Sequence, residues 1–266
     1  MEHQNKPGKP EVRRVKLKVH RYSPEMDKQS HFDKFEIQAD STTTLVDAFE
    51  IIRDTIDPTL TFRSSCHDGV CGSCTVLVNG VEKQACFVTV FELLKGQKEL
   101  VIEPMRNFEI IRDLVVDMTQ FFDKLKAVKP RIVLEETPVA IEEEIPQSRE
   151  NLNKMKNAER CIECGACVSA CPVVSTDPDF LGPAALVAAY RSSIDSRDQR
   201  KHERLKIVDN ENGAWRCHGI YNCFDVCPKN VEPSVVISQL RRLIVSERIK
   251  TLVKHPLTPI PTSSSS

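Results

Sequence analysis

The eleven cysteines of this 266-residue chain fall into three tight groups. The first group lies in SCHDGVCGSC, the second in CIECGACVSACP and the third in CHGIYNCFDVCP. Thiolates that hold iron recur at short fixed intervals, whereas cysteines that only pack in a core need no such spacing. An odd total also leaves one thiol over from any complete set of disulfides. The grouping therefore predicts metal ligation, and iron–sulfur clusters are the cofactors that it favours.

The first group has the C-x4-C-x2-C spacing of a plant-type [2Fe–2S] site. The predicted ligands are Cys66, Cys71, Cys74 and, beyond an Asn-Gly turn, Cys86. Gly69 and Gly72 would allow the loop to adopt positive φ values and wrap closely around the cluster, leaving N–H groups to donate to sulfur. Zinc is the alternative occupant, but this spacing suits a zinc finger poorly. Because four cysteines satisfy the site, we expect His67 to be an exposed loop residue.

The second group is a complete C-x2-C-x2-C-x3-C-P motif, and the third keeps this pattern except for Ile220 at the second cysteine position. In such paired motifs the fourth cysteine ligates the other cluster. The crossover predicts a [4Fe–4S] cluster held by Cys161, Cys164, Cys167 and Cys227. It leaves Cys171, Cys217 and Cys223 for the other site, where an aliphatic side chain offers no ligand to a fourth iron. We therefore expect a [3Fe–4S] cluster there; the alternative is a decayed motif without a cluster.

Local patterns indicate the elements that position these groups. In the first half, alternation, β-branched residues and turn signals predict strands at residues 15–19, 35–39, 75–78 and 100–102. A helix is expected to begin after Thr44, with Asp47 completing a capping box at its start. The second half has few strand signals and is rich in helix formers, for example at 183–191 and 235–248. An α+β arrangement followed by an all-α one is expected.

The domain organisation follows from these changes along the chain. We expect a [2Fe–2S] domain over residues 13–120, a linker over 121–157, a helical domain over 158–250 and a disordered tail over 251–266. Prolines and the run Glu142–Glu144 indicate that much of the linker is extended and solvated. The tail ends in PTSSSS, a composition typical of a disordered terminus.

Composition excludes several classes of protein. With 37 basic and 38 acidic residues, the chain has no net charge that would favour nucleic acid. Its apolar stretches, such as residues 184–189, are much shorter than the ~20 residues that cross a bilayer. The N-terminus MEHQNKPGKPEVRR lacks the apolar core of a secretory signal. Any membrane role is therefore expected to depend on a partner.

The chain resembles the iron–sulfur subunit of succinate dehydrogenase and quinol:fumarate reductase over roughly residues 13–250. Besides the three cysteine motifs, the matching stretches include EPMRNFEIIRDLVVDM, FLGPAALVAAYR and DSRD. The resemblance implies a β-grasp ferredoxin domain followed by a helical ferredoxin domain. It also implies that electrons pass from FAD on a flavoprotein partner through [2Fe–2S], [4Fe–4S] and [3Fe–4S] clusters to quinone. The dicarboxylate site would lie on the flavoprotein, so no catalytic residue is expected here.

The same resemblance implies membrane anchor subunits that hold the protein peripherally on the cytoplasmic face of a bacterial or archaeal cell membrane. By motif, Pro172, His218 and Ile220 would contribute to a quinone pocket. His218 could relay protons to quinone, or hydrogen-bond to the backbone or to a haem propionate of the anchor. Many ubiquinone-using members carry a tryptophan pair where this chain has residues 173–176, VVST, which leaves ubiquinone or menaquinone open.

Two other functions compete with a succinate dehydrogenase subunit. The same architecture could serve a fumarate reductase working in the reverse direction, because sequence does not set direction. A free ferredoxin-type electron carrier is the other alternative. The near-neutral net charge of −1 and three clusters on one chain argue against a free carrier.

Overall fold

A five-stranded mixed sheet forms the first half of the molecule. The computed structural model describes residues 12–134 and 144–254. The strands are β1 (Arg13–Arg21), β2 (His31–Ala39), β3 (Thr75–Val78), β4 (Val81–Gln84) and β5 (Leu100–Glu103). Their order in the sheet is β2-β1-β5-β3-β4, with β1 and β5 parallel and the other pairs antiparallel. All four predicted strands are confirmed, and β4 completes the hairpin that Asn79-Gly80 predicts.

Helix α1 (Leu45–Thr55) packs its apolar side into the core of this half. Thr44 is its N-cap, and the predicted capping box is present: Asp47 N–H donates to the Thr44 hydroxyl at 3.2 Å, and Thr44 N–H donates to the Asp47 carboxylate at 2.8 Å. The short helix α2 (Val90–Leu94) begins with the same kind of box at Thr89. These caps satisfy N–H groups that a helix start otherwise leaves unpaired.

The segment between the halves is more structured than the sequence predicts. A hairpin of β6 (Ile110–Arg112) and β7 (Val115–Val116) leads into α3 (Thr119–Ala127), and α4 (Arg149–Met155) follows later. The expectation of an extended linker is therefore wrong at both of its ends. The reason is packing: Phe121 and Leu125, one turn apart on α3, are buried in the core of the helical half. Glu142 and Glu143 of the acidic run lie outside the described residues.

The second half consists of helices, as predicted. They are α5 (Ala166–Ser169), α6 (Pro172–Thr176), α7 (Gly182–Ile194), α8 (Lys201–Val208), α9 (Asn222–Asp225) and α10 (Pro233–Lys254), with 3-10 turns at Ala158–Arg160 and Ala214–Arg216. The apolar helix α7 lies at the centre and contacts α3, α4, α5, α8 and α10. Helix α10 extends to Lys254, beyond the predicted tail boundary at 251, and the remaining tail lies outside the described residues.

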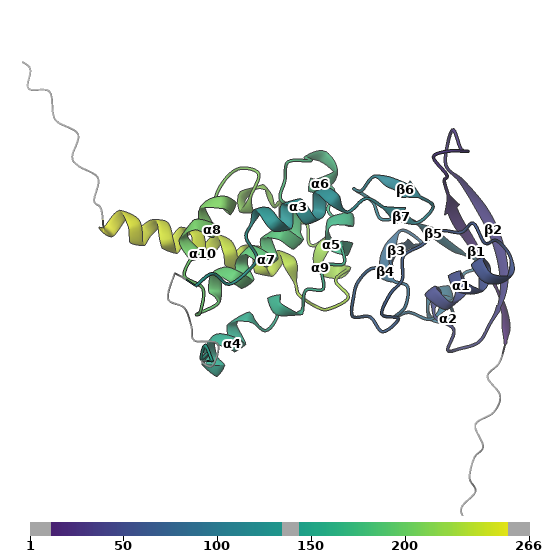
Figure 1. Cartoon of the computed structure of the whole chain (residues 1–266), viewed down its shortest axis with the longest axis horizontal. Coiled ribbons are helices and arrows are strands. Elements are labelled where there is room, and N and C mark those ends of the chain that lie inside the picture. Colours follow the sequence, from purple (N-terminus) through teal and green to yellow (C-terminus); the bar gives the residue numbers. More distant parts are fainter. Residues whose placement is uncertain (1–11, 135–143, 255–266) are drawn as a thin grey trace, which may run out of the picture.

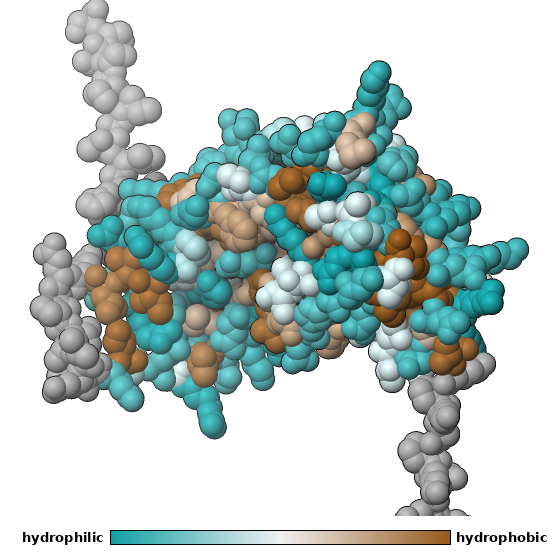
Figure 2. Space-filling view, turned by 45° about the vertical axis from the view of Figure 1, so that its right-hand side comes forward, coloured by the Kyte–Doolittle hydropathy of each residue, from teal (hydrophilic) through white to brown (hydrophobic). Residues whose placement is uncertain are grey.

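The two halves lie next to each other along the long axis of the molecule, with α5 and α9 of the helical half facing the β3–β4 hairpin (Figure 1). Helix α5 contacts β4 directly. The face in Figure 2 is largely hydrophilic, with separate apolar patches. Among the described residues, no helix combines the length and apolar character that crossing a bilayer would require.

Candidate iron–sulfur centres

The first cysteine group lines the loop that precedes β3. The Sγ atoms of Cys74 and Cys86 lie 3.4 Å apart. Backbone N–H groups point at the sulfurs: Val70 N–H donates to Cys66 Sγ at 3.2 Å, and Gly69 N–H donates to Cys86 Sγ at 3.2 Å. The sequence predicts that glycines in this loop adopt positive φ values and leave N–H groups free to donate to sulfur. Gly69 has φ +65°, and the N–H groups point towards the sulfurs as expected. His67 is exposed, as predicted.

These thiols differ in electrostatic environment. Backbone N–H donors from Asp68, Cys71 and Val70 lower the pKa of Cys66 to about 6, whereas burial raises the pKa of Cys74 to about 12. A thiolate is the form that ligates metal, and a bound cation supplies the charge that a buried thiolate otherwise lacks. Two buried and two more accessible thiols around a loop of inward N–H groups therefore fit an iron–sulfur group.

A second cavity is lined by the four cysteines predicted for the four-iron cluster. They are Cys161, Cys164, Cys167 and Cys227, and the rest of the wall includes Ala184, Val187 and Val231. Burial raises the pKa of Cys164 to about 11 and raises the pKa values of Cys161 and Cys167 as well. Four thiols that face one apolar cavity, with no described disulfide among them, are suited to a cationic cluster core.

A third cavity is lined by the other three cysteines, Cys171, Cys217 and Cys223. Ile220 lines the same cavity and is 50% exposed. Burial raises the pKa of Cys223 to about 12. The remaining residues of the predicted quinone pocket, Pro172 and His218, also line this cavity and are exposed.

The fourth cysteine of each motif faces the cavity of the other group. The third cysteine of each motif lies within a short helix, Cys167 in α5 and Cys223 in α9, and the fourth, Cys171 or Cys227, comes two residues after that helix ends. Each of these helices has only four residues. One turn of helix therefore carries the chain from one cavity to the next, which is the geometry that the crossover prediction requires.

The first and second groups meet at Gly72. This residue has φ +73°, and a Cβ added to it would lie 2.5 Å from the Cβ of Cys164. The loop with Cys71 and Cys74 therefore packs against the loop of the second group with no room for a side chain. A second contact joins the same two regions, since the Lys229 ammonium lies 5.9 Å from the centre of the Phe87 ring.

Sequence reasoning did not identify the polar residues that join the two halves. The Asn107 side-chain amide donates to backbone carbonyls of α5 and its following residues, and the Ser169 hydroxyl donates to the Glu82 carboxylate at 2.7 Å. Their partners are 61–87 positions apart in the chain. Periodicity and ligand spacing report only local structure, so neither signal could have found these contacts.

Comparison with known proteins agrees with this geometry. Residues 16–123 match a family model for a "2Fe-2S iron-sulfur cluster binding domain", and residues 157–231 match one for a "4Fe-4S dicluster domain". The chain is 40% identical over 229 residues to a fumarate reductase iron–sulfur subunit of Escherichia coli O6:H1, covering 86% of this chain and 92% of that protein. It is 36% identical over 240 residues to a succinate dehydrogenase iron–sulfur subunit of Paracoccus denitrificans, covering 90% of each.

The fold is also found in a solved structure. A chain of the Mycobacterium smegmatis Sdh1 complex in the apo form matches with a TM-score of 0.78 at 21% identity, over 93% of this chain and 100% of that one. Together with relatives that align over nearly their whole length, this confirms the α+β and all-α architecture. The chain belongs to the family of iron–sulfur subunits of fumarate reductase and succinate dehydrogenase, and it is an electron-transfer subunit of such an enzyme.

Proposed function

We propose that the three cysteine groups hold a [2Fe–2S], a [4Fe–4S] and a [3Fe–4S] cluster with the ligand sets given above. When bound, these clusters supply one-electron redox chemistry between FAD on a flavoprotein subunit and a membrane quinone. The observation that supports this assignment best is the separation of the thiols of the last two motifs into cavities of four and three, with Ile220 in the smaller set. The ferredoxin domain would span residues 13–120 and the helical domain 158–250.

The chain's own residues would hold and tune these groups. In the first site, N–H groups of the loop donate to Cys66 and Cys86, and such donors stabilise negative charge on sulfur and raise a cluster's potential. In the second site, the apolar wall formed by residues such as Val187 and Val231 limits access of water. In the third site, Ile220 and His218 line the wall and are exposed.

The exposed apolar residues suggest where partners bind. Val70 and Phe87, beside the first site, are 59% and 65% exposed, and we assign this surface to the flavoprotein subunit. Ile220, Tyr221 and Phe224, beside the third site, are 39–50% exposed, and we assign this surface to anchor subunits and quinone. Isolated apolar side chains are common on protein surfaces, but clusters next to redox sites indicate interfaces. Binding through anchors would place the protein peripherally on the cytoplasmic face of the membrane.

Succinate oxidation by quinone is the direction that we propose. Fumarate reduction is a second candidate because relatives at 38–40% identity are named fumarate reductase subunits, among them one from Mycobacterium tuberculosis. Membranes that contain the complex should be assayed in both directions with ubiquinone and menaquinone analogues. A faster succinate-driven rate at matched substrate would support the first direction, and a faster fumarate-driven rate would support the second.

Cluster content tests the assignment directly. The purified complex should contain about nine iron and ten acid-labile sulfide per chain, the content of the three proposed cluster types. The oxidised protein should show the EPR signal of a [3Fe–4S] centre. Zinc at one or more per chain with little iron would contradict the proposal. Affinity purification should also recover a larger flavoprotein, whereas a free carrier would be recovered alone.

A further inference from the structure

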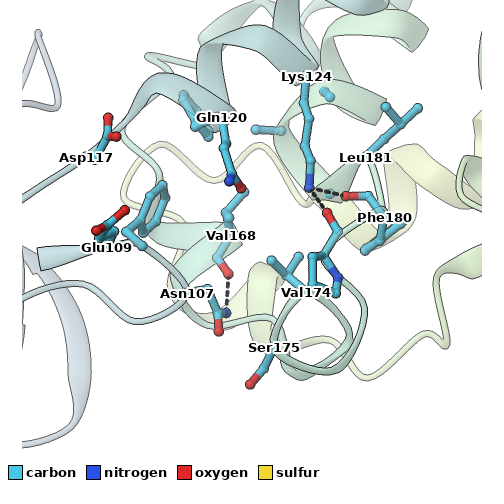
Figure 3. A pocket seen from close by; sticks show the side chains of 16 residues that line it. Asn107, Glu109, Asp117, Gln120, Lys124, Val168, Val174, Ser175, Phe180 and Leu181 are labelled. Carbon is cyan, nitrogen blue, oxygen red and sulfur yellow. Dashed lines mark hydrogen bonds between the residues drawn. The ribbon is translucent and has the colours of Figure 1, made fainter.

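Asn107 lies in the turn between β5 and β6 and reaches the helical half. Its backbone has φ +64°, a left-handed conformation that asparagine adopts more readily than most residues. Its Nδ2 donates to the backbone carbonyls of Val168 at 2.8 Å, Ser169 at 3.1 Å and Cys171 at 3.0 Å. Figure 3 shows the bond to Val168. The last carbonyls of a helix lack partners within it. A side chain of the sheet half therefore caps α5 at its C-terminal end.

A second polar link joins the same short helix to the sheet. The Ser169 hydroxyl donates to the Glu82 carboxylate at 2.7 Å and accepts from the backbone N–H of Arg106 at 3.0 Å. Glu82 is on β4, and Glu82 and Ser169 are 4% and 2% exposed. Because the hydroxyl has one proton and that proton points to Glu82, its remaining capacity is acceptance, which Arg106 uses. The Ser169 hydroxyl thus donates one hydrogen bond and accepts another, and both partners belong to the sheet half.

These links act on the part of the helical half that carries predicted ligands. Helix α5 contains Cys167 and ends two residues before Cys171, while Cys86 follows the end of β4 by two residues. The contact of Gly72 with Cys164 is one point at which the two halves meet. One point of contact leaves two rigid bodies free to rotate, and further separated points remove that freedom. The bonds made by Asn107 and Ser169 supply such points.

We propose that Asn107, supported by the Ser169–Glu82 bond, is a positioning residue that fixes the orientation of the second ligand loop relative to the first. It would thereby set the separation of the two clusters. This inference rests on the proposed ligand sets. It assigns to Asn107 a role in electron transfer that it exerts without ligating iron.

The test compares Asn107→Ala with Asn210→Ala in the intact complex. Asn210 is a matched control, since its Nδ2 donates to the Ile207 carbonyl at 2.8 Å near the end of α8, but within the helical half. Asn107→Ala should retain the wild-type iron content and the separate EPR signals of the first and the second cluster. It should lose the magnetic coupling between the reduced first and second clusters and gain hydrogen exchange at α5 and β4. Asn210→Ala should keep the wild-type coupling and exchange at these two elements.

A second pair of variants keeps the test informative if Asn107→Ala fails to fold. Glu82→Gln retains an oxygen that accepts from Ser169 and should keep the coupling, whereas Ser169→Ala removes the link and should weaken it. Unchanged coupling and exchange in Asn107→Ala, or in Ser169→Ala, at full iron content would overturn the inference. Absence of two distinct cluster signals in the unmodified complex would instead contradict the proposed function.

Discussion

Gly72 is the position where one added methyl group should separate two ligand loops. Its φ of +73° costs a side-chain-bearing residue about 1–2 kcal/mol. The new Cβ would lie 2.5 Å from the Cβ and 2.8 Å from the Cα of Cys164. Since carbon atoms pack at about 3.5–4.0 Å, the loops must move apart by about 1 Å. Overpacking of this kind costs about 1–3 kcal/mol more, so Gly72→Ala should destabilise by about 2–5 kcal/mol.

Gly96→Ala is the matched control for this experiment. Gly96 also has a positive φ, +86°, but a Cβ there would meet nothing within 4 Å. The Gly96→Ala variant therefore has the free-energy cost of a positive φ but no steric clash of the new Cβ with a neighbouring residue. The difference of about 1–3 kcal/mol between the two variants should appear as a thermal midpoint lower by about 2–12 °C for Gly72→Ala. Electron transfer from the first site to the second, followed by freeze-quench EPR, should slow only in Gly72→Ala.

Two results would contradict this reasoning. Equal thermal midpoints in the two variants would mean that the methyl group at position 72 is accommodated without moving Cys164. A Gly72→Ala complex with a lowered midpoint but an unchanged transfer rate would mean that this contact contributes to stability and not to the spacing of the sites. In either case the close approach of the two loops would not determine the rate of electron transfer from the first site to the second.

Three further predictions concern two residues of the proposed sites, Cys227 and Ile220, and one carboxylate of the sheet half, Asp57, which accepts a hydrogen bond from Arg21 of β1. Cys227→Ala should abolish the [4Fe–4S] EPR signal and leave the three-iron signal, because Cys227 faces the second cavity; loss of the three-iron signal alone would reverse our pairing. Ile220→Cys should supply the missing ligand, and the three-iron EPR signal of the oxidised protein should disappear. Asp57→Asn should lower the free energy of unfolding at pH 7 by about 1–2 kcal/mol, allowing for solvent screening. Burial opposes the shift, but hydrogen bonds from Thr59 and Arg21 lower the pKa of Asp57 to about 2. Its contribution is therefore present above the unfolded pKa of about 3.9 and lost as pH falls towards 2, so denaturation midpoints of the two proteins should converge in acid.

Local signals in the sequence were sufficient for the elements of the sheet half. The alternation at residues 15–19 and 35–39 appears as β1 and β2, paired with Val15 opposite Ile37. Thr44 and Asp47 form the predicted capping box. In each case the pattern spans a few residues, and the force that it represents, burial of one face or satisfaction of an N–H group, acts over the same short range.

Features that depend on partners distant in sequence were not predictable in this way. Phe121 and Leu125 make α3 helical through burial against the other half, where propensity and prolines indicated a linker. Asn107 gives no periodic signal, and its importance comes from carbonyls 61–64 residues away. The predicted ligands differ from these, because cluster chemistry requires a fixed spacing that is visible in the chain itself.

The backbone around Ile220 suggests that the vacancy in the third site is chemical and not steric. Both ligand loops of the helical half begin after a 3-10 turn, and the first cysteines have nearly the same conformation, φ −64° and ψ 121° at Cys161 and φ −66° and ψ 125° at Cys217. Both loops then have positive φ at the third and fifth positions, with 55° and 81° in the second motif and 68° and 72° in the third.

Ile220 therefore occupies the position in its loop that Cys164 occupies in the second motif. Each of the two residues lies between two residues with left-handed backbone conformation, so the two loops have similar backbone shapes. The same backbone directs the same Cα–Cβ bond, so a thiol at 220 would point where the Cys164 thiol points in its own loop. Ile220 is 50% exposed, which leaves space for exchange to the smaller cysteine without a buried cavity. The backbone of the third motif could therefore position a cysteine at residue 220, but the sequence places isoleucine there. If Ile220→Cys keeps its full three-iron signal, residue 220 does not determine the cluster type.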